Sequence, residues 1–206
     1  TCSSGDLGGS STSWMNTCQR TGMVMWFNGF TTGLVESPAA VVYGPGKKSG
    51  NDNKFGSSIF TQADFNGDGY LDVLSSAPYD DSSSLSNNGS LWVYAGSSIG
   101  LSSSPMTTLY GTEANANLGL YPYRIGIGDI NGDGIDDLVM GVPTDDTTGG
   151  DAGKVVVHMG TSAFLPSFAS ATLFGEVAGD QFGRSVAVAD VNGDGCLLYT
   201  SPSPRD

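Results

Sequence analysis

The chain has 206 residues, a formal net charge of −13 and an isoelectric point near 4.1, and only three of its 21 acidic residues are glutamate. So acidic a chain argues against nucleic-acid binding, which depends on Lys and Arg neutralising phosphates. Its 31 glycines disfavour long helices, and no apolar run is long enough to insert into and span a membrane.

Residues 1–22 are rich in Ser, Thr and Gly, so we predict a loop-like segment or the end of a sheet unit. Cys2 and Cys18 lie there at a spacing that permits a local disulfide, which is typical of secreted or cell-surface proteins. Two unpaired cysteines are the alternative. The first residue is Thr1, so the lack of a signal peptide carries no information.

Short runs of β-branched and aromatic residues follow, separated by clusters of Gly, Asn and Asp. They include residues 23–29, 41–44 and 58–60. Runs of this length between turn residues are typical of strands, so the chain is predicted to be all-β. Residues 23–63 are predicted to hold the end of one sheet unit and the start of the next.

A nine-residue acidic motif begins at residue 64 and recurs at residues 129 and 190. Oxygen-bearing side chains stand at positions 1, 3, 5 and 9, glycines at positions 4 and 6, and an apolar or aromatic residue at position 7. The candidate metal ligands are Asp64, Asn66, Asp68, the Tyr70 carbonyl and Asp72; Asp129, Asn131, Asp133, the Ile135 carbonyl and Asp137; and, in an incomplete third copy, Asp190, Asn192 and Asp194.

A loop of this composition suits a calcium ion. Ca²⁺ takes about six to eight oxygen ligands, and glycines permit the backbone turns that bring alternate side chains together. An EF-hand opens in the same way but needs a Glu at position 12, where this chain has Ser75, Met140 and Ser201. We therefore predict a loop at the tip of a β-hairpin. A solvated Asp/Asn/Gly turn is the alternative, and three copies in one register argue against it.

The repetition extends over residues 64–195. Asp64 and Asp129 are 65 residues apart, and Asp129 and Asp190 are 61 apart. Each unit has the order strand, acidic loop, strand, Pro-containing turn, long polar loop, strand, and strand ending in Gly. Four short strands per unit are typical of a β-propeller blade, so we predict a partial propeller.

Residues 182–195 resemble the opening half of an FG-GAP repeat, and residues 72–78 and 137–143 resemble its closing half. This is the repeat of the integrin α-chain N-terminal β-propeller, and the resemblance covers residues 23–195. It implies an arc of a seven-bladed propeller that needs further blades for stability. It also implies calcium loops on one face and a protein or glycan partner on the other. The candidate segments of that other face are residues 79–88, residues 144–151, Tyr121, Tyr123 and Arg124.

The chain departs from the FG-GAP pattern in two places. Tyr121 and Pro122 stand eight residues before Asp129, where Phe-Gly is expected, which predicts a reshaped blade edge. In the third copy, Leu198 replaces the ninth-position carboxylate. Residues 196–206 resemble the in-frame translation of a sequencing-library adapter, so we interpret them as a non-native artefact and exclude them from the fold.

No catalytic constellation can be assembled from the sequence. The single histidine, His158, falls at the place of Tyr94 and Phe27 in the repeat, which predicts a structural role. We therefore predict a non-enzymatic, extracellular calcium-binding module of a secreted or cell-surface protein, acting in binding or cell adhesion. A glycosylation sequon at Asn88 is compatible with this location. The alternatives are an accessory propeller of a secreted phospholipase-like hydrolase, and a carbohydrate-binding propeller.

Overall fold

The computed structural model describes residues 22–27, 29–30, 33–34, 38–45, 52–82, 84–189 and 198–200. Its regular elements are strands, apart from a 3-10 turn, η2, at Pro122–Arg124. The strands are β1 (Met23–Trp26), β2 (Gly29–Phe30), β3 (Gly33–Leu34), β4 (Ala40–Tyr43), β5 (Ile59–Ala63), β6 (Asp72–Ala77), β7 (Ser90–Tyr94), β8 (Thr107–Tyr110), β9 (Ile125–Gly128), β10 (Asp137–Val142), β11 (Lys154–His158), β12 (Ala171–Phe174), β13 (Ala187–Ala189) and β14 (Leu198–Thr200).

Two complete four-stranded units occupy the middle of the chain. Strands β5 to β8 form one antiparallel sheet and β9 to β12 form the other, both in chain order. The registers correspond, because Leu74 pairs with Val93 in the first sheet as Val139 pairs with Val157 in the second. These sheets confirm the all-β prediction and have the form of propeller blades, and we call them blade A and blade B.

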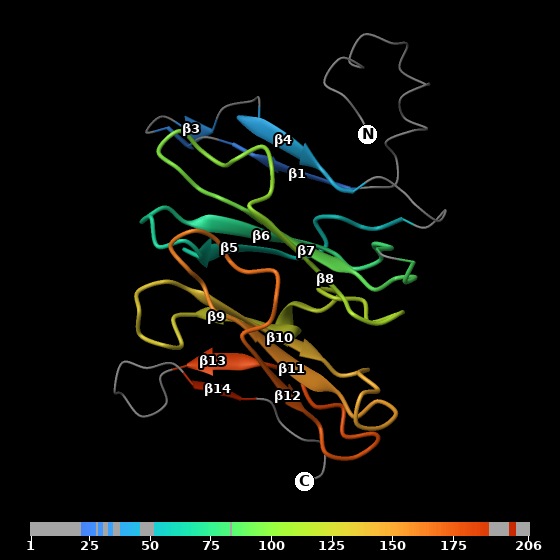
Figure 1. The fold of residues 1–206 in the computed structure, drawn as a ribbon. Coiled ribbons are helices and arrows are strands. Elements are labelled where there is room, and N and C mark those ends of the chain that lie inside the picture. The colour runs from blue at the N-terminus through green and yellow to red at the C-terminus, as the bar shows by residue number, and fades with distance from the viewer. Residues whose placement is uncertain are drawn as a thin grey trace.

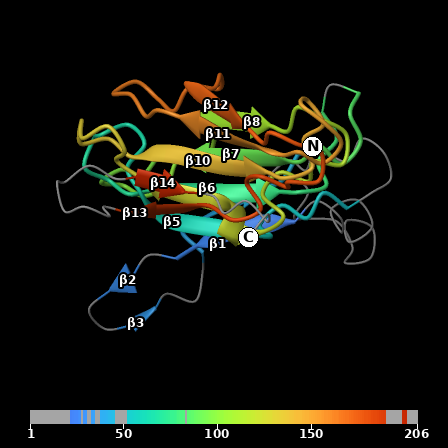
Figure 2. The ribbon, with the colours of Figure 1, turned by 90° about the horizontal axis from the view of Figure 1, so that it is seen from below.

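Shorter pairs of strands flank the two blades. Before blade A, β1 pairs with β4, and β2 forms a small hairpin with β3. After blade B, β13 pairs with β14, whose residues fall in the segment interpreted above as non-native. Figure 1 shows the four sheets stacked from the blue β1–β4 pair to the red β13–β14 pair. Seen from below, β8 and β12 lie along one edge of this stack and β5 along the other (Figure 2).

Each blade is buried on both faces because successive side chains of a strand point to opposite sides. In β7, Leu91 and Val93 face blade B, whereas Trp92 and Tyr94 face β1 and β4. All six residues of β10 are buried for the same reason. The core between the two blades is made by Ala63, Phe65, Leu74, Leu91, Val93 and Leu109 on one side and by Leu118, Ile125, Leu138, Met140 and Leu165 on the other.

The connection before each blade's last strand reaches back over the preceding sheet. Leu165, between β11 and β12, is fully buried in the core against blade A, and its carbonyl accepts a hydrogen bond from the Thr107 hydroxyl at 2.6 Å. Leu101, between β7 and β8, packs against the cluster of Val24 and Val42 in the sheet before blade A. These overlaps fix each blade to its neighbour in addition to face-to-face packing.

The place of the Phe-Gly pair in blade B is taken by Leu118 and Gly119, which the order of the repeat aligns with Phe182 and Gly183, and not by Tyr121, to which the count of eight residues pointed. Leu118 forms a parallel bridge to blade A in the way that Phe182 forms one to blade B, and its side chain is buried. Gly119 has a φ of +79°, like the glycine after Phe182. Tyr121 instead begins an insertion that runs through η2 to β9, and this insertion is why the count of eight residues failed.

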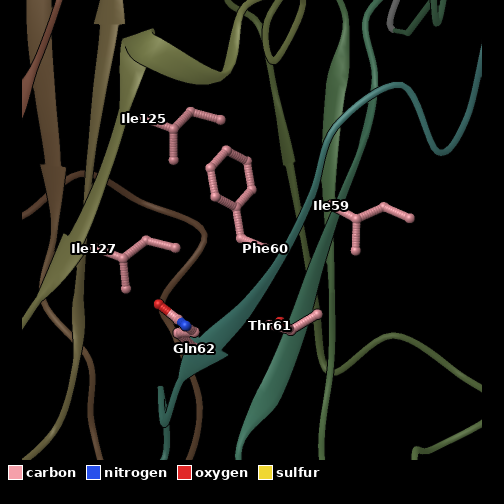
Figure 3. Close-up of a pocket in the computed structure, with 6 residues that line it drawn as sticks. All are labelled: Ile59, Phe60, Thr61, Gln62, Ile125 and Ile127. Atoms are coloured by element: carbon pink, nitrogen blue, oxygen red, sulfur yellow. The ribbon is translucent and has the colours of Figure 1, made fainter.

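The first strands of the two blades face each other across an open pocket of about 300 Å³. It is lined by Ile59, Phe60, Thr61, Gln62, Ile125 and Ile127. In Figure 3 the Phe60 ring points from β5 toward Ile125 and Ile127 of β9. This apolar contact aligns the two strands whose far ends carry the acidic loops.

Candidate metal centre

The two complete acidic motifs lie at hairpin tips, as predicted. Loop one (residues 64–71) joins β5 to β6, and loop two (residues 129–136) joins β9 to β10. Both lie on the same side of the stack, at the left of Figure 1. The glycines at positions 4 and 6 of both loops have φ between +68° and +84°, the left-handed region that the curled backbone requires. The third candidate set, Asp190, Asn192 and Asp194, lies outside the described residues.

In loop one the polar side chains fold over the loop's own backbone. The Asp64 carboxylate accepts hydrogen bonds from the N–H groups of Asp68 at 3.1 Å and Gly69 at 2.8 Å. The Asp68 carboxylate accepts one from the Tyr70 N–H at 2.9 Å. The Asn66 oxygen accepts from the Asp68 N–H at 3.1 Å, while its nitrogen donates to Asp68 Oδ2 at 2.9 Å.

Loop two repeats these contacts. Asp129 accepts hydrogen bonds from the N–H groups of Asp133 at 3.1 Å and Gly134 at 2.7 Å. Asp133 accepts from the Ile135 N–H at 2.9 Å, and the Asn131 nitrogen donates to Asp133 Oδ2 at 2.9 Å. The same nine-residue motif therefore adopts the same loop shape in both blades.

The ninth residue of each motif is a buried carboxylate that fastens the loop to its sheet. Asp72 is fully buried and accepts hydrogen bonds from the N–H groups of Phe65 and Gly96, each at 2.9 Å. Asp137 is also fully buried and accepts from the N–H groups of Ile130 at 2.9 Å and Gly160 at 2.8 Å. This carboxylate therefore ties the start of the loop to the residues that follow the blade's third strand.

Burial raises the pKa of the Asp72 carboxyl, because the charged form loses hydration. The two backbone hydrogen bonds act in the opposite direction, and the negative charges of Asp64 and Asp68 raise the pKa further. The pKa of Asp137 is raised by the same causes, with Asp133 and Asp129 as the charged neighbours. In each loop the buried ninth-position carboxylate thus lies near the negative charges of two further candidate ligands.

The donor set of each loop fits a hard cation. It consists of three carboxylates, an amide oxygen and the carbonyl at position 7, and among the described residues no Lys or Arg forms an ion pair with any of them. The carboxylates do not converge as they stand, however, since no three acidic, His or Cys side chains in the described segments are close enough to hold a metal. Asp64 and Asp129 bind loop amides instead, and would have to turn inward on binding a cation.

A second pattern of buried acids was missed at the sequence level. Asp80 and Asp145 follow the Pro turns, and both are buried. Asp80 accepts a hydrogen bond from the Ser90 hydroxyl at 2.8 Å, whereas Asp145 contacts the ammonium of Lys154, which occupies the place of Ser90 in blade B. In both blades the buried Asp stands two residues after the Pro, so comparison of the two repeats could have identified it.

The Asp145 site also links the blades. Lys154 donates to the Thr112 hydroxyl at 3.0 Å and lies 3.7 Å from the Glu113 carboxylate, both of which follow β8 of blade A. Burial raises the pKa of Glu113, and the neighbouring Asp145 raises it further. Burial acts to raise the pKa of Asp145, but its interactions with the Glu113 carboxyl group, Lys154 and Thr147 outweigh burial and lower that pKa.

On the side of the blades opposite loops one and two, Lys and Arg side chains lie over tyrosine rings. In the η2 insertion, the rings of Tyr121 and Tyr123 stack with centroids 5.2 Å apart, and the Arg124 guanidinium lies 4.5 Å from the centroid of Tyr121. Lys54 lies over the ring of Tyr79 at 4.8 Å. The two tyrosines of the insertion are 38% and 51% exposed, so this cluster is accessible to a ligand.

Two residues singled out in the sequence are enclosed in the fold. His158 is buried at the end of β11, where Tyr94 ends β7, and its Nδ1–H donates to the Pro166 carbonyl at 2.9 Å. Asn88 is fully buried, and its amide nitrogen donates to the Ser82 hydroxyl at 2.5 Å and the Gly111 carbonyl at 2.7 Å. The folded chain therefore leaves no room for a glycan on Asn88. Cys2 and Cys18 lie outside the described residues.

Comparison with known proteins places the repeats in the FG-GAP family. The FG-GAP repeat matches residues 55–94 and 121–158. The chain is 33% identical over 160 residues to phosphatidylinositol-glycan-specific phospholipase D of Bos taurus, which covers 74% of the chain and 19% of that protein. It is 32% identical over 160 residues to integrin alpha-4 of Xenopus laevis, covering 73% of the chain and 14% of that protein.

The chain thus carries FG-GAP repeats, as the sequence motifs predicted, and spans about a fifth or less of the length of these relatives. In the described part, no helix has the length and apolar character needed to cross a membrane.

Proposed function

We propose that this chain is a calcium-binding propeller segment of an extracellular protein, in which cations hold the hairpin tips in place and the opposite end of the blades binds a partner. The supporting observation is the pair of loops that repeat one all-oxygen donor set, each with a buried carboxylate whose pKa is raised and with two further carboxylates beside it. A bound Ca²⁺ would neutralise this charge. The role of the cation would be structural, because it joins residues that lie at the two ends of each loop.

Isothermal titration calorimetry with Ca²⁺ tests this proposal on the whole chain. We expect two binding events, of which Asp68→Asn removes one and Asp133→Asn the other, because each substitution removes a charged ligand from one loop. Asp52→Asn is the control, since Asp52 is an exposed acid outside both loops. Mg²⁺ should bind more weakly because it demands a stricter octahedral shell. An absence of Ca²⁺ binding by the unaltered chain would refute the proposal.

The partner-binding part of the proposal rests on the Tyr121–Tyr123–Arg124 cluster. Exposed aromatic and arginine side chains are enriched in recognition surfaces, and this cluster belongs to an insertion that the corresponding approach to β13 lacks. Binding of the chain to cell surfaces and to a glycan array should fall at least about tenfold in the Tyr121→Ala/Tyr123→Ala variant. Tyr110→Ala, at a tyrosine of β8 that is 48% exposed, should bind normally. Equal binding by all three proteins would exclude the cluster.

The similarity to phosphatidylinositol-glycan-specific phospholipase D favours a second candidate, an accessory domain of a secreted hydrolase. In that case catalysis would reside outside these residues and the propeller would position the enzyme on its substrate. The full transcript separates the two candidates, because only the second requires an adjoining hydrolase domain.

A further inference from the structure

Loop one and loop two are joined to each other through Asp136, the eighth residue of the second motif. The Asp136 carboxylate accepts a hydrogen bond from the Asp64 N–H at 2.8 Å, and the Asp136 N–H donates to the Asp64 carbonyl at 2.9 Å. Asp64 is the residue that supplies the first candidate ligand of loop one. Its backbone is therefore held on both sides by one residue of the neighbouring loop.

The contact between the loops continues on either side of Asp136. A Cβ added to Gly67 of loop one would lie 2.8 Å from Cγ1 of Ile135 in loop two, and one added to Gly160 of blade B would lie 3.2 Å from the Phe65 carbonyl oxygen of loop one. Gly160 is itself bonded to the buried carboxylate of Asp137. Because the loops meet without spare volume, a shift of the loop-two backbone must displace loop one.

This link depends on the identity of position eight and is not a general feature of the repeat. Leu71 stands at position eight of loop one, and its side chain is 62% exposed. A leucine cannot accept a hydrogen bond from a backbone N–H. Asp136 is thus the one described residue at this position that can orient a neighbouring loop by its side chain.

We infer that Asp136 is a positioning residue that couples cation binding in loop two to cation binding in loop one, an inference that rests on the proposed calcium function. A cation in loop two fixes the backbone between Asp133 and Asp137, and Asp136 lies within that span. Asp136 then holds Asp64 in place for the cation of loop one. Because coupling between two binding sites is reciprocal, a cation in loop one strengthens binding in loop two by the same factor.

Loop one contains its own reporter. Tyr70 stands at position 7 of loop one, whereas loop two has Ile135 there. Terbium ion takes oxygen ligands as Ca²⁺ does and luminesces when a nearby tyrosine is excited, so Tyr70-sensitised emission follows the filling of loop one. Calorimetry with Ca²⁺ on the same protein follows both loops together.

The test titrates Tb³⁺ into the whole chain and four variants. We expect Asp136→Ala to weaken binding at loop one about tenfold, the effect of losing one hydrogen bond of a charged acceptor. Asp136→Asn keeps an acceptor oxygen and should retain most of the affinity, and Leu71→Ala is the matched control at position eight. Asp133→Asn, which weakens the cation site of loop two, should lower loop-one affinity without changing a residue of loop one.

The outcomes separate this inference from the proposed function. If the unaltered chain binds neither Tb³⁺ nor Ca²⁺, the calcium function itself fails. If it binds both but loop-one affinity is the same in Asp133→Asn and Asp136→Ala as in the unaltered chain, calcium binding stands and the coupling is refuted. Equal losses in Asp136→Ala and Asp136→Asn would also refute it, because they would assign the effect to charge alone. If Asp136→Ala does not fold, Asp133→Asn decides.

Discussion

At the scale of the residue, the polar side chains that are buried in this chain have charged or hydrogen-bonding partners at equivalent places of the repeat. Lys154 replaces Ser90 and brings a charge into the space between blades, where Asp145 and Glu113 meet it. His158 replaces Tyr94 at the end of the third strand, where a carbonyl accepts its ring hydrogen. At both positions blade A has a side chain that is neutral at pH 7, whereas blade B has one that can carry a positive charge.

The histidine makes the stability of the fold dependent on pH. Burial lowers the pKa of His158, while its hydrogen bond to Pro166 acts in the opposite direction. A lowered pKa in the folded state means that the histidine's contribution is present above its ordinary pKa of about 6.5 and is lost as the pH falls through the folded value.

We expect His158→Tyr, which copies Tyr94 of blade A, to flatten this dependence. The measurement is the free energy of unfolding in urea between about pH 5 and pH 7.5 for both proteins. The difference between them should grow in favour of the variant as the pH falls, because the variant has no imidazole to protonate on unfolding. A difference that stays constant across this range would contradict the assignment to His158.

At the scale of the element, alternation and turn residues were enough to predict the strands and the hairpin tips. The acidic loops follow β5 and β9 as expected, because their glycines and the hydrogen bonds between side chains and the loop's own amides are local features of nine residues. The segment before β9 was predicted in part: its edge is reshaped as expected, but the residue count pointed to Tyr121 although a bridge to another sheet decides which residue takes the Phe position. Burial of Leu118 outweighs the resemblance of Tyr121 to the expected phenylalanine, and a residue count contains no information on that contact.

For the candidate metal site, as for the strands, the sequence predicted the local features but not the contacts between units. Spacing predicted the candidate ligands of each loop, and that set stays a prediction. Spacing did not predict the burial of Asp72 and Asp137 or their bonds to glycines that follow the third strand. The bond from Asp136 to Asp64 joins positions 72 residues apart and depends on how blades stack. Such contacts are set by packing between units, which a single repeat cannot specify.

Two single substitutions test which residue closes blade B. Leu118→Ala should lower the free energy of unfolding by about 3 kcal/mol, since it opens a cavity in the core between blades. Tyr121→Ala should cost about 1 kcal/mol, the worth of an exposed ring pair. Urea denaturation monitored by tryptophan fluorescence measures both. A larger loss for Tyr121→Ala than for Leu118→Ala would return the Phe-Gly role to Tyr121.

At the scale of the whole molecule, blades are held together by apolar faces, by overlapping connections and by the contact between acidic loops. The first two act between the faces of the sheets. The third lies at one side of the stack, where the three candidate ligand carboxylates of each loop bring negative charges together. Under the proposed function, a cation that removes this repulsion would act on the contact between the blades as well as on each hairpin. The number of blades in the ring is not fixed by these residues, and seven remains the prediction from the resemblance.

The most direct test of this account is the melting temperature of the chain with Ca²⁺ and with a calcium chelator. If cations hold the hairpin tips, saturating Ca²⁺ should raise the melting temperature by about 5 °C or more over the chelated protein, because ligand binding to the folded state alone stabilises it. The rise should be abolished in the Asp68→Asn/Asp133→Asn variant. Identical melting temperatures with Ca²⁺ and with chelator would contradict the account.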